Sequence, residues 1–162
     1  MNTINCSCTN GCQSCNQFNP CAVKCGCCCG RFGDYAYIYN TTAQTAAAGD
    51  TITFSSNGPL SGTITHTAGT DSIAIGNTGV YLVKYYVDST QDGEVSVYRN
   101  SEPVTGSTRA VEGTGNGEFL LAAQVGDVLT LVNTGDAEAQ LEDGGAAPEA
   151  VVNAAVTIIR VF

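Results

Sequence analysis

From about Asp34 onwards, hydrophobic and polar residues alternate in short runs that are separated by Gly, Asn and Asp. In Tyr35–Asn40, tyrosines alternate with small or aliphatic residues. In Asp50–Ser56, Ile52 and Phe54 share one side of an extended chain and threonines share the other. Alternation with a period of two is typical of β-strands that bury one face. Both segments are therefore predicted to be strands.

Similar runs continue to the end of the sequence. They are Thr63–Thr67, Ser72–Ile75, Gly79–Ser89, Gly93–Asn100, Arg109–Gly113, Gly117–Val125, Asp127–Gly135 and Asn153–Phe162. Gln91-Asp92-Gly93 has the composition of a hairpin turn, and Ala137–Ala150 is expected to be a loop or a hairpin with an acidic tip. No segment has the pattern of an amphipathic helix. About nine or ten short strands predict an all-β sandwich of the jelly-roll type, with the last strand in a central position.

Residues 1–33 have a different composition, because they consist largely of Asn, Ser, Gly and Cys with little apolar patterning. Such a segment cannot bury a core of its own and is expected to be extended or irregular until something ties it down. We therefore predict two parts, a cysteine-rich N-terminal connector arm over residues 1–33 and a jelly-roll domain over residues 34–162. The length of 162 residues suffices for one domain with a real core.

Charge is distributed unevenly between these two parts. Lys24 and Arg31 are the only charged residues of the arm, whereas residues 34–162 carry four basic and fifteen acidic residues. Nucleic-acid binding rests on Lys and Arg that neutralise phosphates, so an acidic body without a basic patch argues against a nucleic-acid partner. The sequence also shows neither a secretory signal nor a long apolar run, so no membrane partner is expected.

All nine cysteines lie within the first 29 residues. They are Cys6, Cys8, Cys12, Cys15, Cys21, Cys25, Cys27, Cys28 and Cys29. Their Cys-x-Cys and Cys-x2-Cys spacings can chelate a soft metal such as zinc or copper(I), or an iron–sulfur cluster. A second Cys-x2-Cys at the spacing of a zinc site is missing, however, and the only histidine, His66, lies far away in a predicted strand.

Disulfides between chains fit the cysteine pattern better than a metal site does. An odd number leaves at least one cysteine for another chain, another ligand or the free state. Neighbouring cysteines such as Cys27, Cys28 and Cys29 pair poorly with one another but alternate in direction along an extended chain. All nine are therefore candidates for intermolecular disulfides, and pairing within one chain stays open.

The sequence contains no catalytic motif, so we expect that the protein is not an enzyme and needs no cofactor. His66 has no nucleophile motif beside it and is expected on a surface or at a subunit interface. Several aspartates adjoin turns, where an aspartate commonly bonds its own backbone; they are Asp34, Asp50, Asp71 and Asp127. The glycine-rich segment Glu112–Glu118 is expected to be a turn rather than a phosphate cradle.

Two further groups of side chains bear on possible sites. Four acids could ligate calcium but follow no EF-hand spacing; they are Asp136, Glu138, Glu142 and Asp143. Six tyrosines at strand spacing are expected in the core or at an interface; they are Tyr35, Tyr37, Tyr39, Tyr81, Tyr85 and Tyr86.

Three segments carry a resemblance to a known family. They are GPLSGTITHTAGTDSIAIGNTGVYLVKYYV (Gly58–Val87), GEFLLAAQVGDVLTLVN (Gly117–Asn133) and AAVTIIRVF (Ala154–Phe162). With these, the body resembles the C-terminal domain of BclA-type collagen-like glycoproteins of the Firmicutes spore surface, or exosporium. That domain shares its jelly roll with tumour necrosis factor (TNF) and the complement globular heads. The resemblance implies a TNF-like jelly roll that forms a homotrimer.

A cysteine arm stands where those relatives carry a collagen stem. This layout is similar to that of Ena-type spore appendage subunits, in which a cysteine-bearing connector reaches the next jelly roll. The resemblance thus implies a self-assembling subunit of a disulfide-linked fibre, at the spore surface or extracellular, that needs no signal peptide because the mother cell lyses. Two alternatives stay open. One is a trimeric head that binds a surface or carbohydrate and is anchored, for example to a spore-coat protein, by its cysteines. The other is a metal-binding arm on a β scaffold.

Overall fold

The computed structural model describes residues 33–162, and this part of the chain is all-β. Its strands are β1 (Tyr35–Asn40), β2 (Gln44–Ala46), β3 (Ser56–Ser61), β4 (Thr65–His66), β5 (Ile73–Ala74), β6 (Gly79–Asp88), β7 (Gly93–Arg99), β8 (Glu102–Pro103), β9 (Arg109–Val111), β10 (Thr114–Ala123), β11 (Val128–Asn133), β12 (Ala139–Leu141) and β13 (Ala154–Arg160). None of the described residues forms a helix that could cross a membrane.

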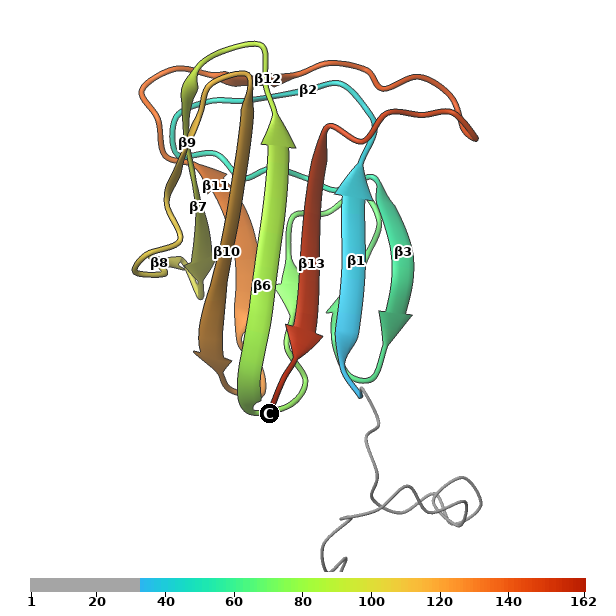
Figure 1. The fold of residues 1–162 in the computed structure, drawn as a ribbon, viewed down its shortest axis with the longest axis vertical. Helices are drawn as coiled ribbons and strands as arrows, with labels where there is room; N and C mark the ends of the chain where they lie inside the picture. Colours follow the sequence, from blue (N-terminus) through green and yellow to red (C-terminus); the bar gives the residue numbers. More distant parts are fainter. Residues whose placement is uncertain (1–32) are drawn as a thin grey trace, which may run out of the picture. The chain divides into compact units, whose positions relative to one another are not determined.

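The strands form two layers of a jelly-roll sandwich (Figure 1). The five-stranded sheet has the order β10-β6-β13-β1-β3 and lies in front in the figure. The six-stranded sheet behind it has the order β4-β5-β11-β7-β8, and β9 also pairs with β7. A small two-stranded sheet, β12-β2, crosses one end of the sandwich. This architecture confirms the predicted fold class.

The core lies between the two main sheets and consists of side chains that alternate along the strands. Ile38, Val83 and Ile158 of the five-stranded sheet are 0% exposed, and Val95 and Leu131 of the six-stranded sheet are 1% exposed. The period-two pattern of the sequence therefore reports which side chains are buried between the layers.

The last strand, β13, lies in the middle of the five-stranded sheet, as predicted. It pairs antiparallel with β1 over Tyr35–Asn40 and with β6 over Tyr81–Val87. The two ends of the described chain are thus joined through adjacent strands.

Two predictions about the segments between β2 and β4 were wrong. Asp50–Ser56 is not a continuous strand, because only Thr51 and Phe54 form isolated bridges, to Val132 of β11 and to Thr70 in the loop between β4 and β5. Ile52 and Phe54 are nevertheless fully buried. The strand β3, by contrast, was missed because its Gly58 and Pro59 are typical of turns; Pro is tolerated there because β3 is an edge strand.

Two later segments also differ from expectation. Ala137–Ala150 does not form a hairpin on itself, since its strand β12 pairs with Gln44–Ala46. In the glycine-rich Glu112–Glu118, only the part around Gly113, with φ of 73°, turns, and β10 already begins at Thr114. Glycines that the sequence suggests for a turn here lie inside a strand, where they make room for neighbouring side chains.

Candidate assembly surface

The side of the five-stranded sheet that faces away from the core, called the outer face here, carries side chains in three rows set by strand register. From β10 to β1, the apolar row is Leu120, Leu82, Ile159 and Tyr35; the charged row is Glu118, Lys84, Thr157 and Tyr37; and the tyrosine row is Asn116, Tyr86, Ala155 and Tyr39. Residues directly opposite one another on neighbouring strands share a face of a sheet, so each row is continuous across four strands.

Within the described part of the chain, the apolar row forms an exposed hydrophobic band. Leu120 is 65% exposed, although it lies directly opposite Leu82, which in turn lies opposite Ile159. Leu82 and Ile159 are partly exposed. A contiguous apolar surface that no other part of residues 33–162 covers is typical of a protein interaction site.

The tyrosines of β1 extend this surface towards the edge strand β3. The rings of Tyr37 and Tyr39 stack with centroids 5.3 Å apart and planes inclined by 22°. Gly58 of β3 lies against this stack, since a Cβ atom there would lie 2.6 Å from Cδ1 of Tyr37. Aromatic rings of this kind offer large contact area at an interface.

The charged row, which lies between the apolar row and the tyrosine row, contains one ion pair. Lys84 Nζ lies 2.5 Å from Glu118 Oε2, and about half of each side chain is exposed, 51% and 55%. At the upper end of β6, burial raises the pKa of Tyr86, and the neighbouring Asp88 raises it further. Tyr86 is therefore a neutral hydrogen-bonding group at physiological pH.

The six tyrosines predicted to lie in the core or at an interface divide between the core and the outer face. Tyr81 and Tyr85 point inwards and are 0% and 3% exposed. Burial raises the pKa of Tyr85 to about 12, against a smaller opposing effect of Arg109. Its hydroxyl donates a hydrogen bond to the carbonyl oxygen of Ser107, across the sandwich. The remaining four tyrosines lie on the outer face.

Asp34, the first residue of the predicted jelly roll, is buried and accepts hydrogen bonds from three distant segments. Its Oδ1 accepts from the Thr63 backbone N–H at 2.7 Å, and its Oδ2 accepts from Asn77 Nδ2 at 3.0 Å and Arg160 Nη1 at 3.3 Å. Burial opposes ionisation, but bonds from Asn77, Thr63 and Arg160 outweigh it and lower the pKa of Asp34. The prediction of a local turn aspartate was wrong here, because all these donors are remote in sequence.

The other three aspartates divide in the same way. Asp50 and Asp127 accept from the backbone N–H groups of Ala47 and Gln124, three residues before them, as expected of turn aspartates, and Asp127 also accepts a 2.7 Å bond from the remote Asn100 Nδ2. Asp71 instead accepts a 2.7 Å bond from the hydroxyl of Thr51, which, with smaller effects, lowers its pKa.

His66 lies at the edge between the two sheets rather than on the outer face. Its Nδ1 lies 2.5 Å from Asn57 Oδ1 of β3, and its Nε2 lies 3.1 Å from the carbonyl oxygen of Thr70. The ring also packs edge-on against Phe54, with centroids 6.0 Å apart. These contacts give His66 a structural role in linking the layers and place no nucleophile beside it.

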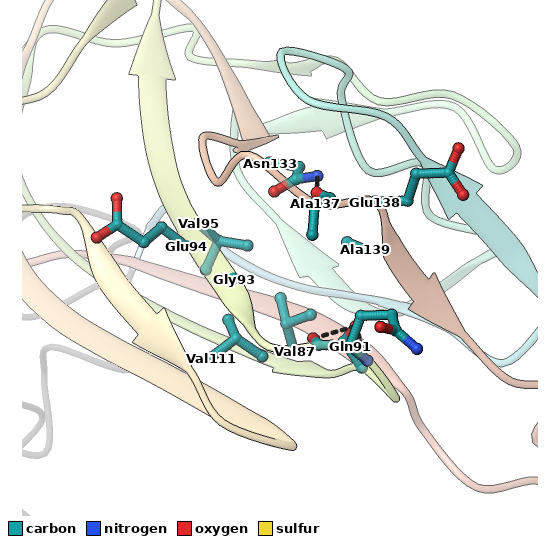
Figure 2. A pocket seen from close by; sticks show the side chains of 11 residues that line it. Val87, Gln91, Gly93, Glu94, Val95, Val111, Asn133, Ala137, Glu138 and Ala139 are labelled. Atoms are coloured by element: carbon teal, nitrogen blue, oxygen red, sulfur yellow. Dashed lines mark hydrogen bonds between the residues drawn. The ribbon is translucent and has the colours of Figure 1, made fainter.

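Two hollows of the described region are candidates for a ligand site. The pocket in Figure 2, where Val87, Val95 and Val111 meet, is too narrow to admit a water-sized molecule. A cavity of about 230 Å³ lies near Asp88, Glu142 and Asp143. Within residues 33–162, however, no three His, Cys, Asp or Glu side chains are placed to hold one metal ion. The four acids weighed for calcium, Asp136 among them, are accordingly not brought together as ligands.

The nine candidate disulfide cysteines, Cys6 to Cys29, lie outside the described residues, so their pairing stays a prediction. The boundary between the arm and the jelly roll likewise stays a prediction. The structure shows the outer face, which the sequence did not predict. The only sequence signal for it was the strand spacing of the tyrosines.

Comparison with solved structures supports the fold. The globular domain of zebrafish complement 1qA protein is 11% identical, with a TM-score of 0.60 over 80% of this chain and 98% of that one. The TNF Eiger from S. frugiperda is 17% identical, with a TM-score of 0.59 over 80% and 92%. Murine APRIL is 11% identical, with a TM-score of 0.57 over 79% and 98%. No family model and no curated protein matches the sequence.

The described part of the chain is therefore a jelly roll of the type found in TNF and complement globular domains. At these identities the likeness defines the fold, and function has to be argued from the surface itself.

Proposed function

We propose that this protein is a structural, non-enzymatic subunit that self-assembles through the outer face of its five-stranded sheet. In this proposal three jelly rolls associate into a trimer, and the N-terminal cysteines join trimers by disulfides into a fibre at a spore surface or outside the cell. The observation that carries it is a neutral, largely apolar face on an otherwise strongly acidic body.

The charge distribution supports a second copy of the same chain as the partner. Residues 33–162 carry fifteen acidic against four basic residues, so most surfaces of two copies repel each other. The three rows of the outer face contain one basic and one acidic residue, Lys84 and Glu118, which neutralise each other. Two copies of this acidic chain therefore approach most favourably where the outer face takes part in the contact.

The cysteine arm supplies the link between assembled units. A contact between one surface of a subunit and a different surface of the next does not close on itself and produces a fibre. Disulfides across such a contact turn a reversible polymer into one that survives dilution. Release from a lysing mother cell would expose the arm to oxidant, which would allow its cysteines to form disulfides.

The first test examines the full chain by negative-stain electron microscopy and SDS gels, oxidised and then reduced. We expect filaments and an SDS-resistant ladder that collapses on reduction. Discrete particles with no ladder in the oxidised sample would contradict the fibre. A stoichiometric metal content of the purified protein would instead support a metal-binding arm.

The second test addresses the outer face under reducing conditions. Leu120→Asn should weaken self-association, measured by sedimentation velocity, because it removes the most exposed apolar side chain of the face. Val151→Asn is the matched control, since Val151 is 62% exposed but lies in the loop before β13. Equal behaviour of the two variants would contradict the assignment of the outer face.

A ligand-binding head anchored by the cysteines is the second candidate function. The likeness to the globular domain of a complement protein and to a TNF favours it, as an analogy of fold. A soluble trimer that does not polymerise when oxidised, and that is retained on a carbohydrate array, would support this candidate over the fibre.

A further inference from the structure

Lys84 and Glu118 are the only charged residues in the three rows of the outer face, and they occupy its middle row. They lie directly opposite each other on β6 and β10, with the apolar row on one side and the tyrosine row on the other. Lys84 is also the only lysine among residues 33–162. The next charged group along β6, Asp88, lies at the end of the strand beside Tyr86.

The pair contributes little to the stability of an isolated subunit. Each side chain is about half exposed, so water screens the attraction and ordering the two chains costs entropy. Aliphatic and aromatic side chains nevertheless flank the pair on both sides, and a contiguous exposed surface of this kind is typical of an interaction site. The position of the pair therefore requires an explanation beyond the monomer.

Covering the outer face changes the energetics of the pair. A charge that loses its water is tolerated only if its counter-charge stays in contact, and removing one partner leaves an uncompensated buried charge. The apolar row by itself discriminates poorly between different arrangements of the two subunits. Leu82, Leu120 and Ile159 offer similar contacts when the partner subunit shifts along the sheet. Lys84 and Glu118 belong to the same subunit. Their contact is kept in arrangements where the partner leaves the two side chains together, and it is lost where side chains of the partner insert between them.

We propose that the Lys84–Glu118 pair is the specificity element of self-assembly, which selects one arrangement of subunits on the outer face. The inference rests on the proposed function, since it assumes that a second copy covers this face. The pair acts in the assembled state by penalising every arrangement that separates the two charges or leaves one of them facing an apolar surface.

The experiment uses the full chain under reducing conditions and measures oligomer size distributions by sedimentation velocity and native mass spectrometry. Four variants are compared with the unmodified protein. They are Lys84→Met, Glu118→Leu, the double variant Lys84→Met/Glu118→Leu, and the exchanged pair Lys84→Glu/Glu118→Lys. Thermal unfolding of each variant at the lowest usable concentration reports whether the fold itself is retained.

Each single variant should raise the dissociation constant of the oligomer roughly 30-fold or more, because it leaves one charge unpaired in the contact. The double apolar variant should associate at least as tightly as the unmodified protein but with several oligomer sizes. The exchanged pair should restore a single size, because it keeps the two charges in contact. This rescue separates a specificity role from general damage to the fold.

Two failures are distinguishable. Single variants and a double variant that assemble like the unmodified protein, with one size and unchanged affinity, would overturn this inference and leave the proposed function standing. An unmodified protein that stays monomeric at all concentrations would overturn both.

Discussion

Gly117 on β10 lies directly opposite Tyr85 on β6, and a Cβ atom at Gly117 would lie 2.5 Å from the Cε1 and Cζ atoms of the tyrosine ring. The ring can therefore reach across the sandwich to Ser107 only because residue 117 has no side chain. A glycine that looks like a turn residue in the sequence is a packing residue in the structure.

Gly117→Ala should lower the free energy of unfolding by about 1–3 kcal/mol, because the ring of Tyr85 must move within a close-packed core. Chemical denaturation of the full chain under reducing conditions measures this. Asn116→Ala, which changes the neighbouring exposed residue, is the control. Tyr85→Leu combined with Gly117→Ala should cost less than the sum of the two single changes, and strict additivity would contradict the clash.

Ionisation of Tyr85 should make the fold sensitive to alkali. Its pKa is raised to about 12, so the folded protein holds the proton above the ordinary value of 10.0. The stabilisation is complete below pH 10 and is lost as pH rises through about 12. In denaturation curves recorded in this interval, the free energy of unfolding should fall more steeply for the unmodified protein than for Tyr85→Phe, by up to about 1.4 kcal/mol per pH unit. Parallel curves for the two proteins would contradict the assignment.

Asp34→Asn should lower the free energy of unfolding by about 3 kcal/mol at pH 7, because an amide places a donor against the donors of Asn77 and Arg160. Asp50→Asn is the matched control, since the Asp50 side chain is exposed and its carboxylate accepts a bond from the nearby Ala47 backbone N–H. It should change stability by less than about 0.5 kcal/mol. Equal losses in both variants would contradict the central role of Asp34.

The contribution of Asp34 should also depend on acid pH. Its pKa in the folded protein lies below the ordinary value of 3.8. The stabilisation is therefore present above about pH 4 and is lost as pH falls through the lower folded value. The difference between the unmodified protein and Asp34→Asn should be constant from about pH 5 to 7 and shrink below pH 4. A difference that stays constant down to pH 2 would exclude the charge as its cause.

Deletion of residues 1–31 should leave a folded jelly roll, because the core and the hydrogen bonds described above all lie within residues 33–162. Far-UV circular dichroism and the unfolding midpoint should match those of the reduced full chain. The same deletion should abolish the SDS-resistant ladder. Filaments that persist after the deletion would exclude the arm as the connector.

The strands that were predicted correctly are those in which one face is buried between the sheets, such as β1 and β6. Their alternating patterns are local, so a single sequence contains them. The local pattern gave wrong predictions where burial and hydrogen bonding depend on remote segments. Asp50–Ser56 alternates like a strand but forms only isolated bridges. β3 was not predicted because it contains Gly58 and Pro59, which an edge strand tolerates.

The candidate surface was only partly predictable for the same reason. The tyrosine spacing in Tyr35–Asn40 predicted side chains in the core or at an interface, without deciding between the two. The rows themselves depend on the register between β10, β6, β13 and β1, which lie far apart in the sequence. Likewise, the hydrogen-bond donors to Asp34 are Thr63, Asn77 and Arg160. No local sequence pattern predicts these remote partners.

The strand order has a mechanical consequence for the end of the jelly roll that adjoins the cysteine segment. β1 begins at Tyr35 and is paired along its length with β13 on one side and with β3 on the other, while Asp34 just before it is tied to Arg160. The hydrogen bonds of these ladders run perpendicular to the strand. A force that pulls the chain at Gly33 along the axis of β1 therefore loads the bonds of two ladders together in shear, rather than opening them one after another. Tension applied at Gly33 is therefore opposed by both ladders at once.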